Sequence, residues 1–335
     1  MVMLASIRKA FGLRQGLSVK VYDGYGDQDD MIIHGHVFKV WPVEKEKLRD
    51  NVWANTMQLL RLFMVRPAPK VKVRLEWHGR SYHTRTDQEG FFKFEWKPHT
   101  RLEQGWHEVS VHLDDESAKG IKGTGRIYTP FDEQLAFISD IDDTFLISHS
   151  ANLGKRLYVL FTENAGTRRP FEDVVKHYQA LAIGTGRSKH PDPFFYVSSS
   201  EWNLYDYIKR FMAVHGLPEG ILLLSPLKRL SNVWRTGQGR HSIKFVRIAR
   251  ILSSYPHHRY VLLGDDTQQD PEIYASVVEH FPGKVKAIYI RRVRKDHRNR
   301  TERFLAGLKE AGVEVCYFNH SREAIAHSRA IGLIH

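Results

Sequence analysis

The chain has 335 residues, of which 42% are hydrophobic, and this is enough to build two domains with real cores. Its formal net charge of +12 and isoelectric point near 9.6 favour acidic partners such as phosphate esters, anionic membranes or nucleic acid, without choosing among them. Cys316 is the only cysteine, which excludes an intrachain disulfide. The lone cysteine fits a reducing compartment, so we expect a cytoplasmic protein, with peripheral membrane association as an option. No run approaches the ~20 apolar residues of a membrane span.

The first 16 residues predict a short N-terminal helix or tail. Leu4, Ile7 and Phe11 fall on one helical face with basic residues nearby, so we expect the segment to cover apolar surface of the protein. Contact with a membrane interface is the alternative. The segment lacks the apolar core of a secretory signal.

Residues 17–129 predict an antiparallel β-sandwich domain of immunoglobulin-like or transthyretin-like type. In Lys70–Trp77 apolar and charged residues alternate strictly, which is typical of a strand with one buried face. Turn sequences such as His78-Gly79 and Thr86–Gly90 separate this run from later ones. The apolar positions of two later runs are Phe92, Phe94, Trp96, Val109, Val111 and Leu113. We expect a helical or irregular insertion at Glu44–Leu62.

An acidic turn near the start of this domain could be mistaken for a calcium loop. Asp27, Asp29 and Asp30 lack the ligand spacing and the downstream glutamate of an EF-hand, so we interpret them as a surface turn. The sequence does not assign a function to the domain. A packing partner, a membrane adaptor and a protein-binding module are all compatible with it.

Residues 130–335 predict an α/β domain that begins after Thr129-Pro130. Apolar runs alternate with helical patterns, which predicts crossover units and a parallel sheet covered on both faces. The expected strands are Leu135–Ser139, Pro193–Ser198, Gly220–Leu224, Tyr260–Gly264, Val285–Ile290 and Val313–Phe318. The clearest helix is Trp202–His215, which Gly216 ends.

The most informative stretch of the chain is FISDIDDT, Phe137–Thr144. A short apolar run that ends in three aspartates and a threonine indicates a buried strand whose carboxyl end delivers side chains to a crevice. Carboxylates this crowded repel one another unless a cation lies between them, so the pattern favours a metal with oxygen ligands, most simply Mg²⁺. A solvated acidic strand end is the alternative, because short acid clusters also occur by chance.

The DxDxT pattern in this stretch resembles the haloacid-dehalogenase superfamily of aspartate-nucleophile phosphotransferases. Two later stretches, FFYVSSSEWNLYDYI (Phe194–Ile208) and RYVLLGDDTQQDPEIY (Arg259–Tyr274), narrow the resemblance to the catalytic domain of the actin-patch type of phosphatidate phosphatase. The resemblance extends from about Ala136 to Val293. It implies a Rossmann-like parallel sheet, Mg²⁺ as cofactor and an aspartyl-phosphate intermediate.

The resemblance also implies a role for each acidic residue of the first motif. Asp140 would be the nucleophile and a Mg²⁺ ligand. Asp142 would protonate the leaving group and then deprotonate the attacking water, while its backbone carbonyl ligates Mg²⁺. Asp143 and Thr144 would brace the loop, and Thr144 is a candidate substrate contact as well.

A hydroxyl group is expected at the end of the second strand. Ser198 would hydrogen-bond a phosphoryl oxygen, with Ser199 as a further candidate substrate contact. Serines before a helix are also common N-caps, and we expect Ser199 or Ser200 to be one. Glu201 stands where the family usually has a proline.

The third and fourth motifs would supply an amine and further carboxylates. Lys244 matches the lysine of the family and would screen the nucleophile and the phosphoryl group; a helix-surface lysine is the alternative. Asp265 would ligate Mg²⁺ directly, and Asp270 would contact the ion directly or through another group. Asp266 competes with Asp270 for this second acidic position.

The substrate is less sharply defined. The insertion around 148–192 is too short for a large cap, so the site would be open to a bulky or surface-bound substrate, and Arg168 and Arg169 within it are candidate substrate contacts. Basic residues after the strand at Val285–Ile290 could attract anionic lipid headgroups; a solvated helix start is the alternative. They are Arg291, Arg292, Arg294, Lys295, Arg298, Arg300 and Arg303. Arg292 stands where the family has an aspartate.

We therefore expect a Mg²⁺-dependent phosphatase that acts on phosphatidate or a related lipid phosphate. A phosphatase for nucleic-acid ends or a soluble phosphomonoester is the first alternative, although nucleic acid is the less favoured partner. A scaffold protein that binds through its sandwich domain is the second.

Overall fold

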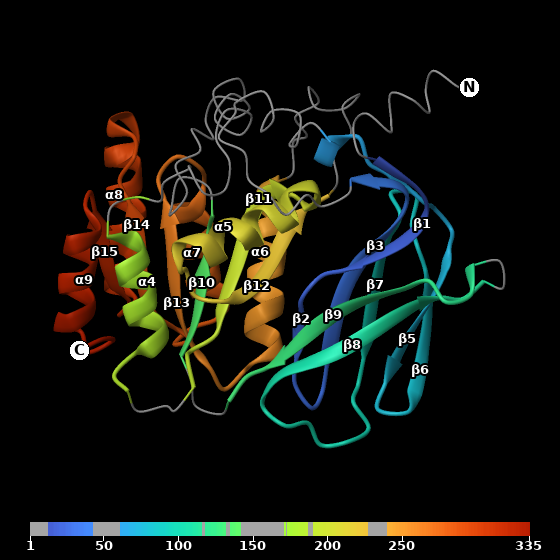
Figure 1. Cartoon of the computed structure of the whole chain (residues 1–335). Coiled ribbons are helices and arrows are strands. Elements are labelled where there is room, and N and C mark those ends of the chain that lie inside the picture. Colours follow the sequence, from blue (N-terminus) through green and yellow to red (C-terminus); the bar gives the residue numbers. More distant parts are fainter. Residues whose placement is uncertain are drawn as a thin grey trace. The chain divides into compact units, whose positions relative to one another are not determined.

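The computed structural model of the chain describes residues 13–42, 61–115, 118–131, 135–141, 171, 173–186, 190–226 and 240–335. Among these residues, two compact units are found, unit 1 within residues 13–130 and unit 2 within residues 131–335 (Figure 1). The expected N-terminal helix and nearly all of the insertion at 44–62 lie outside the described residues.

Unit 1 is built on a mainly antiparallel sheet. Its strands are β1 (Leu13–Val21), β2 (Gly24–Gly26), β3 (Met31–Pro42), β4 (Arg66–Pro67), β5 (Lys72–Trp77), β6 (Arg80–Arg85), β7 (Phe91–Trp96), β8 (Gly105–Leu113) and β9 (Lys122–Thr129). Their order is β1-β3-β2-β9-β8-β5-β6, with β4 and β7 paired to β3; the β2–β9 pair is parallel. The antiparallel architecture is thus confirmed, and the immunoglobulin-like or transthyretin-like topology stays a prediction.

Alternation along the strands of unit 1 produces its core. In β5, Val73, Leu75 and Trp77 are buried, while Lys72 and Glu76 are exposed. The same pattern in β7 and β8 buries the six apolar positions expected from the sequence. They are Phe92, Phe94, Trp96, Val109, Val111 and Leu113. Because side chains of successive strand residues point to opposite faces, the charged residues that alternate with these apolar ones remain outside the core.

Two turns of unit 1 follow from their residue types. His78 and Gly79 join β5 to β6 with φ angles of 45° and 76°, which a two-residue hairpin of type I′ requires. In the acidic turn, the Asp27 carboxylate accepts hydrogen bonds from the backbone N–H groups of Asp29 (2.8 Å) and Asp30 (3.1 Å). These bonds are typical of an aspartate that closes a surface turn.

Unit 2 contains a six-stranded parallel sheet and confirms the α/β expectation. Its strands are β10 (Leu135–Ser139), β11 (Phe194–Glu201), β12 (Gly220–Ser225), β13 (Arg259–Asp265), β14 (Val285–Arg291) and β15 (Glu314–Phe318). Its α-helices are α4 (Val174–Ile183), α5 (Tyr205–His215), α6 (Arg240–Ser254), α7 (Asp270–His280), α8 (Arg298–Glu310) and α9 (Ser321–Ala330), with 3₁₀ turns η2 (Trp202–Leu204) and η4 (Lys295–His297). Residues along β11, β12 and β13 are buried almost without interruption, as in a sheet covered on both faces.

One expectation about β11 is wrong. The strand continues to Glu201, which pairs with Ser225 of β12 beyond an irregularity in the register. Ser199 and Ser200 are therefore strand residues and not helix N-caps. The backbone N–H of Ser200 donates to the hydroxyl of Ser198 (2.9 Å), so this N–H has a local acceptor where the pairing with β12 is irregular.

The strand order determines where a site can form. From edge to edge it is β12-β11-β10-β13-β14-β15 (Figure 1). Counted within the unit, the order is 3-2-1-4-5-6, so the chain leaves β10 toward one edge and later returns to add strands toward the other. Ligands of such sheets bind beyond the carboxyl ends of the strands at this reversal, which here lies between β10 and β13.

Candidate active site

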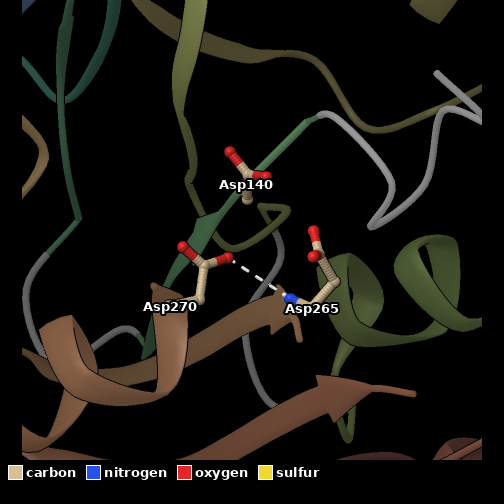
Figure 2. A group of neighbouring side chains, drawn as sticks. All are labelled: Asp140, Asp265 and Asp270. Carbon is tan, nitrogen blue, oxygen red and sulfur yellow. Dashed lines mark hydrogen bonds between the residues drawn. The ribbon is translucent and has the colours of Figure 1, made fainter. Parts of the chain in front are cut away.

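Three aspartates meet at the reversal point of the parallel sheet. Asp140 follows the last residue of β10, Asp265 is the last residue of β13, and Asp270 is the first residue of α7. All three side chains have an exposed fraction of 0%, and one carboxylate oxygen from each lies within 4.8 Å of the others (Figure 2). The sequence placed Asp140 and Asp265 at strand ends, and the parallel pairing of β10 with β13 brings those ends together.

Local hydrogen bonds hold the three carboxylates in place. The Asp140 N–H donates to the carbonyl oxygen of Leu263 (2.8 Å), which extends the β10–β13 ladder by one residue. The carboxylate of Asp265 accepts the backbone N–H of Thr267 (2.6 Å) and its hydroxyl group. The Asp265 N–H in turn donates to the carboxylate of Asp270 (3.3 Å; Figure 2). These hydrogen bonds therefore fix the loop between β13 and α7 to the side chains of Asp265 and Asp270.

Gly264 is required by the close approach of α7 to β13. A Cβ atom at this position would lie 2.4 Å from a carboxylate oxygen of Asp270 and 2.9 Å from the hydroxyl oxygen of Tyr274. That hydroxyl donates to the carbonyl oxygen of Leu263 (2.9 Å) and so fixes the first turns of the helix on the strand. The glycine of the motif therefore has a packing role: it makes room for Asp270.

Lys244 reaches the same cluster from α6. Its side chain is only 8% exposed, its Nζ atom lies 3.0 Å from Oδ1 of Asp140, and it donates a hydrogen bond to Oδ1 of Asp270. Burial by itself lowers the pKa of Lys244, but Asp140 and Asp270 together raise it by more than burial lowers it. The pKa therefore lies above its ordinary value, and the ammonium group stays charged. The alternative of a helix-surface lysine is wrong.

Negative charge predominates among the four residues of the cluster. Three ionised carboxylates and one ammonium group would together carry a formal charge of −2, and all four side chains are buried. Burial, followed by repulsion from Asp270, raises the pKa of Asp265 to about 8, which shows how poorly the site tolerates a third ionised carboxylate without a cation. Carboxylate oxygens are the ligands that hard divalent ions prefer, so the donor set fits one divalent metal ion.

Several predicted site residues cannot be compared with this geometry. Asp142, Asp143, Thr144, Arg168 and Arg169 lie outside the described residues. Their roles therefore stay predictions.

Ser198 lies on β11, beside β10. Ser139 of β10 pairs with Tyr196 of β11. Ser198 is two residues beyond Tyr196, toward the carboxyl edge of the sheet at which Asp140 lies, and its side chain is buried. Ser199 follows it and is half-buried. A contact of either serine with a phosphoryl group stays a prediction.

Asp266 has a different task from its neighbours. One of its carboxylate oxygens accepts the backbone N–H groups of Val293 (2.8 Å) and Arg294 (2.9 Å), and the other accepts the hydroxyl of Tyr317 (2.7 Å). This side chain ties the loop after β13 to the loop after β14, and it is not among the three acids of the cluster. The geometry therefore favours Asp270 over Asp266 as the further acidic contact.

Arg247 is a positioning residue that the sequence analysis missed. It follows Lys244 by one helical turn on α6 and donates hydrogen bonds to the carbonyl oxygens of Leu224 (2.6 Å) and Ser198 (3.2 Å). It thereby ties α6 to the carboxyl ends of β11 and β12. Its spacing from Lys244 places both on one side of the helix and is the signal by which the sequence could have identified it.

Several basic residues at and after the end of β14 form hydrogen bonds or ion pairs within unit 2. Arg291 is buried and donates to the hydroxyl of Ser321 (2.7 Å), so it is not a headgroup contact. Three others form ion pairs with acidic side chains of unit 2. These pairs are Arg294–Asp296, Arg298–Glu302 and Arg300–Glu272, at 2.6, 2.7 and 2.5 Å. Within the described part of the chain, no helix combines the length and the apolar character needed to span a bilayer.

The residues of this cluster lie within a stretch of the chain that matches a known protein family. Residues 135–292 match the family described as phosphatidate phosphatase APP1, catalytic domain. The chain is 29% identical to phosphatidate phosphatase APP1 of Saccharomyces cerevisiae over 165 residues, which are 47% of this chain and 26% of the relative. It is also 29% identical to an uncharacterised protein of Schizosaccharomyces pombe over 103 residues, 30% of this chain and 16% of that relative. The expected family resemblance is confirmed, and the match spans about a quarter or less of either relative's length.

Solved structures add little to this comparison. A carbohydrate acetylesterase from Xanthomonas citri aligns with 92% of this chain and 73% of its own, at 11% identity and a TM-score of 0.32. A TM-score of this size is too low to indicate a common fold.

Proposed function

We propose, from the membership of residues 135–292 in the catalytic-domain family of phosphatidate phosphatase APP1, that this chain hydrolyses phosphate monoesters and that its substrate is phosphatidate or a related lipid phosphate. The observation that carries the proposal is the meeting of Asp140, Asp265, Asp270 and Lys244 at the reversal point of a parallel sheet. Buried carboxylates are costly to maintain, and such a cluster in a crevice is typical of a catalytic site.

In the proposed reaction, Asp140 is the nucleophile. One of its carboxylate oxygens attacks the phosphorus atom, the bond from phosphorus to the leaving alcohol oxygen breaks, and an aspartyl-phosphate forms. Asp142 donates a proton to the leaving oxygen. It then takes a proton from the water that attacks the phosphorus atom. The bond between phosphorus and the Asp140 oxygen breaks, which releases inorganic phosphate and restores the Asp140 carboxylate.

The remaining residues of the cluster hold the nucleophile and balance charge. The Lys244 ammonium group bridges Asp140 and Asp270, so it orients the nucleophile and faces the charge that develops on the phosphoryl group. Ser198 would donate a hydrogen bond to a phosphoryl oxygen. Thr144, Ser199, Arg168 and Arg169 are the further proposed substrate contacts.

Mg²⁺ is the proposed cofactor. Asp140, Asp265 and Asp270 would hold it, together with the backbone carbonyl of Asp142. The bound ion supplies positive charge that offsets the negative charge of the phosphoryl oxygens. The formal charge of −2 and the all-oxygen donor set of the cluster support this assignment.

We extend the proposal to the fold. The strand order of unit 2 and the family match support a haloacid-dehalogenase-type Rossmann-like domain at 130–335, with a small cap insertion around 148–192. The antiparallel sheet and the apolar core of unit 1 support a β-sandwich domain at 17–129.

A phosphate-release assay across four substrates tests the function. They are phosphatidate in vesicles, short-chain phosphatidate, an oligonucleotide with a terminal phosphate, and p-nitrophenyl phosphate, each with Mg²⁺ and after chelation. We expect Mg²⁺-dependent release that is fastest from phosphatidate. Release from no substrate in the presence of any divalent ion would overturn the phosphatase proposal, and fastest release from the oligonucleotide would overturn the lipid assignment.

A further inference from the structure

The outward face of unit 1 carries a row of basic side chains that crosses four neighbouring strands. The strands lie in the order β9-β8-β5-β6, and their register places Arg74 opposite both His83 and His112, and His112 opposite Lys122. Directly opposed residues of antiparallel strands share one face. The residues before and after Arg74 in β5 are fully buried, so the row faces outward.

A second pair extends this row along the same face. Lys72 lies opposite Arg85, and both side chains are exposed. We call the following six residues the basic face: Lys72, Arg74, His83, Arg85, His112 and Lys122. Lys72, Arg85 and Lys122 have no ion-pair partner within the ranges that the structure describes.

Two acidic residues partly neutralise the basic face. Glu76 lies 2.9 Å from Arg74 and 3.5 Å from His112, and Asp114 lies 3.1 Å from His83. Four Lys or Arg charges against two carboxylates leave a formal charge of +2 with both histidines neutral. Like charges on directly opposite residues destabilise a sheet. An anionic surface that approaches the basic face would therefore reduce the repulsion between its cations.

The shape of the basic face indicates what kind of partner it fits. Neighbouring strands lie about 4.8 Å apart, so a row across four strands spans about 14 Å, which is wider than one small anion. Small-molecule sites are concave and bury most of their ligand, whereas these side chains stand on the outside of a sheet.

We propose that the basic face docks unit 1 on the surface of an anionic lipid bilayer. The choice of a lipid surface as the partner rests on the lipid substrate proposed above. Several headgroups would contact the row at once, and Lys72, Arg85 and Lys122 would supply the charges that no side chain of the described residues neutralises. Docking keeps the whole chain at a surface where a lipid phosphate is present.

Vesicle binding of the full-length protein tests this proposal. The triple variant Lys72→Gln, Arg85→Gln, Lys122→Gln removes the three unneutralised charges of the basic face. A matched variant, Lys39→Gln, Arg66→Gln, Arg101→Gln, removes the same charge from exposed residues of β3, β4 and the segment before β8. Affinity is measured by co-sedimentation with phosphatidylcholine vesicles that contain or lack phosphatidylserine, at fixed salt concentration.

We expect the first variant to lose roughly 100-fold in affinity for vesicles with phosphatidylserine, because each cation near an anionic surface contributes about a fivefold factor. The matched variant should lose less than about tenfold, since it leaves the row intact. Both should melt at the temperature of the unsubstituted protein and retain phosphate release from p-nitrophenyl phosphate. Equal losses in the two variants, or unchanged binding in the first, would overturn the proposal.

Two further readouts separate this proposal from others. Tighter binding of an oligonucleotide than of the vesicles, lost in the first variant alone, would assign the face to nucleic acid and overturn the lipid surface. Phosphatidylserine is not a phosphomonoester, so vesicle binding is measured without turnover. A protein that binds these vesicles through the basic face but releases no phosphate would retain the docking proposal and refute the proposed function.

Discussion

Two ion pairs, Lys97–Asp29 of unit 1 and Lys244–Asp140 of unit 2, differ sharply in burial. In unit 1, Lys97 and Asp29 form an ion pair at 2.7 Å with both side chains mostly exposed. In unit 2, Lys244 and Asp140 form a pair at 3.0 Å that is almost completely buried. An exposed pair contributes little to folding, whereas burying two charges costs free energy that their attraction offsets only in part. Stability alone does not account for the buried pair, and this supports a chemical role for it.

The difference originates in the two kinds of sheet. Antiparallel strands of unit 1 alternate buried and exposed residues, so charged side chains have an outward face to occupy. The parallel strands of unit 2 are buried on both faces, and polar side chains gather at their carboxyl ends. Matched substitutions in the two units therefore test whether burial gives a charged side chain its role.

The largest expected effect is that of Asp140→Asn. The amide cannot act as the nucleophile, so we expect phosphate release from every substrate to fall by about 10⁴-fold or more. Asp29→Asn makes the same chemical change in the exposed pair and should leave the rate unchanged. The measurement is phosphate release with Mg²⁺, with circular dichroism as the check on folding. A folded Asp140→Asn variant that keeps its activity would remove Asp140 from the mechanism.

Lys244→Met tests the cost of breaking the buried pair. It leaves Asp140 and Asp270 without their ammonium group, so we expect the free energy of unfolding to fall by about 3–5 kcal/mol, measured with urea in the absence of metal. Lys97→Met breaks the exposed pair and should leave the free energy of unfolding unchanged within experimental error. Similar losses in the two variants would show that burial does not distinguish the pairs.

Gly264→Ala tests whether the site depends on close packing. The added methyl group must displace Asp270 or Tyr274, so we expect the affinity for Mg²⁺ to fall by about 10–100-fold, measured by calorimetric titration. Gly79→Ala in unit 1 is the matched change, because its Cβ would meet no atom within 4 Å. It strains the β5–β6 turn, where φ is +76°, without altering metal affinity. Unchanged affinity in Gly264→Ala would show that Asp270 needs no precise placement.

The smallest effect is a pH dependence that the two units share. Burial lowers the pKa of His36 in unit 1 and of His177 in unit 2 to about 3. The unfolded chain takes up these protons as pH falls below about 6.5, and the folded protein does so only near pH 3, so stability is lost on acidification in that window. Each histidine contributes at most about 1.4 kcal/mol per pH unit to the slope.

His36→Gln and His177→Gln should each flatten this slope. The measurement is the free energy of unfolding in urea at pH 7 and at pH 5. An unchanged slope in both buried-site variants would contradict the assignment of neutral buried imidazoles.

Features that depend on neighbouring residues could be predicted from the sequence. Alternation predicted β5, β7 and β8, and apolar runs ending in acids predicted that Asp140 and Asp265 lie at strand ends. Periodicity and turn chemistry are local properties, so they can be read without knowing what packs against them.

Which of the candidate groups meet depends on the tertiary structure. Lys244 of α6 lies against Asp140, directly after β10, and Asp270 takes the place in the cluster that Asp266 does not. Strand β11 also continues through the serines expected to cap a helix. In unit 1, Arg74 is aligned with His83, His112 and Lys122 across four strands. These outcomes depend on strand register and on the packing of helices against the sheet, which join residues far apart in the chain and leave no local pattern in the sequence.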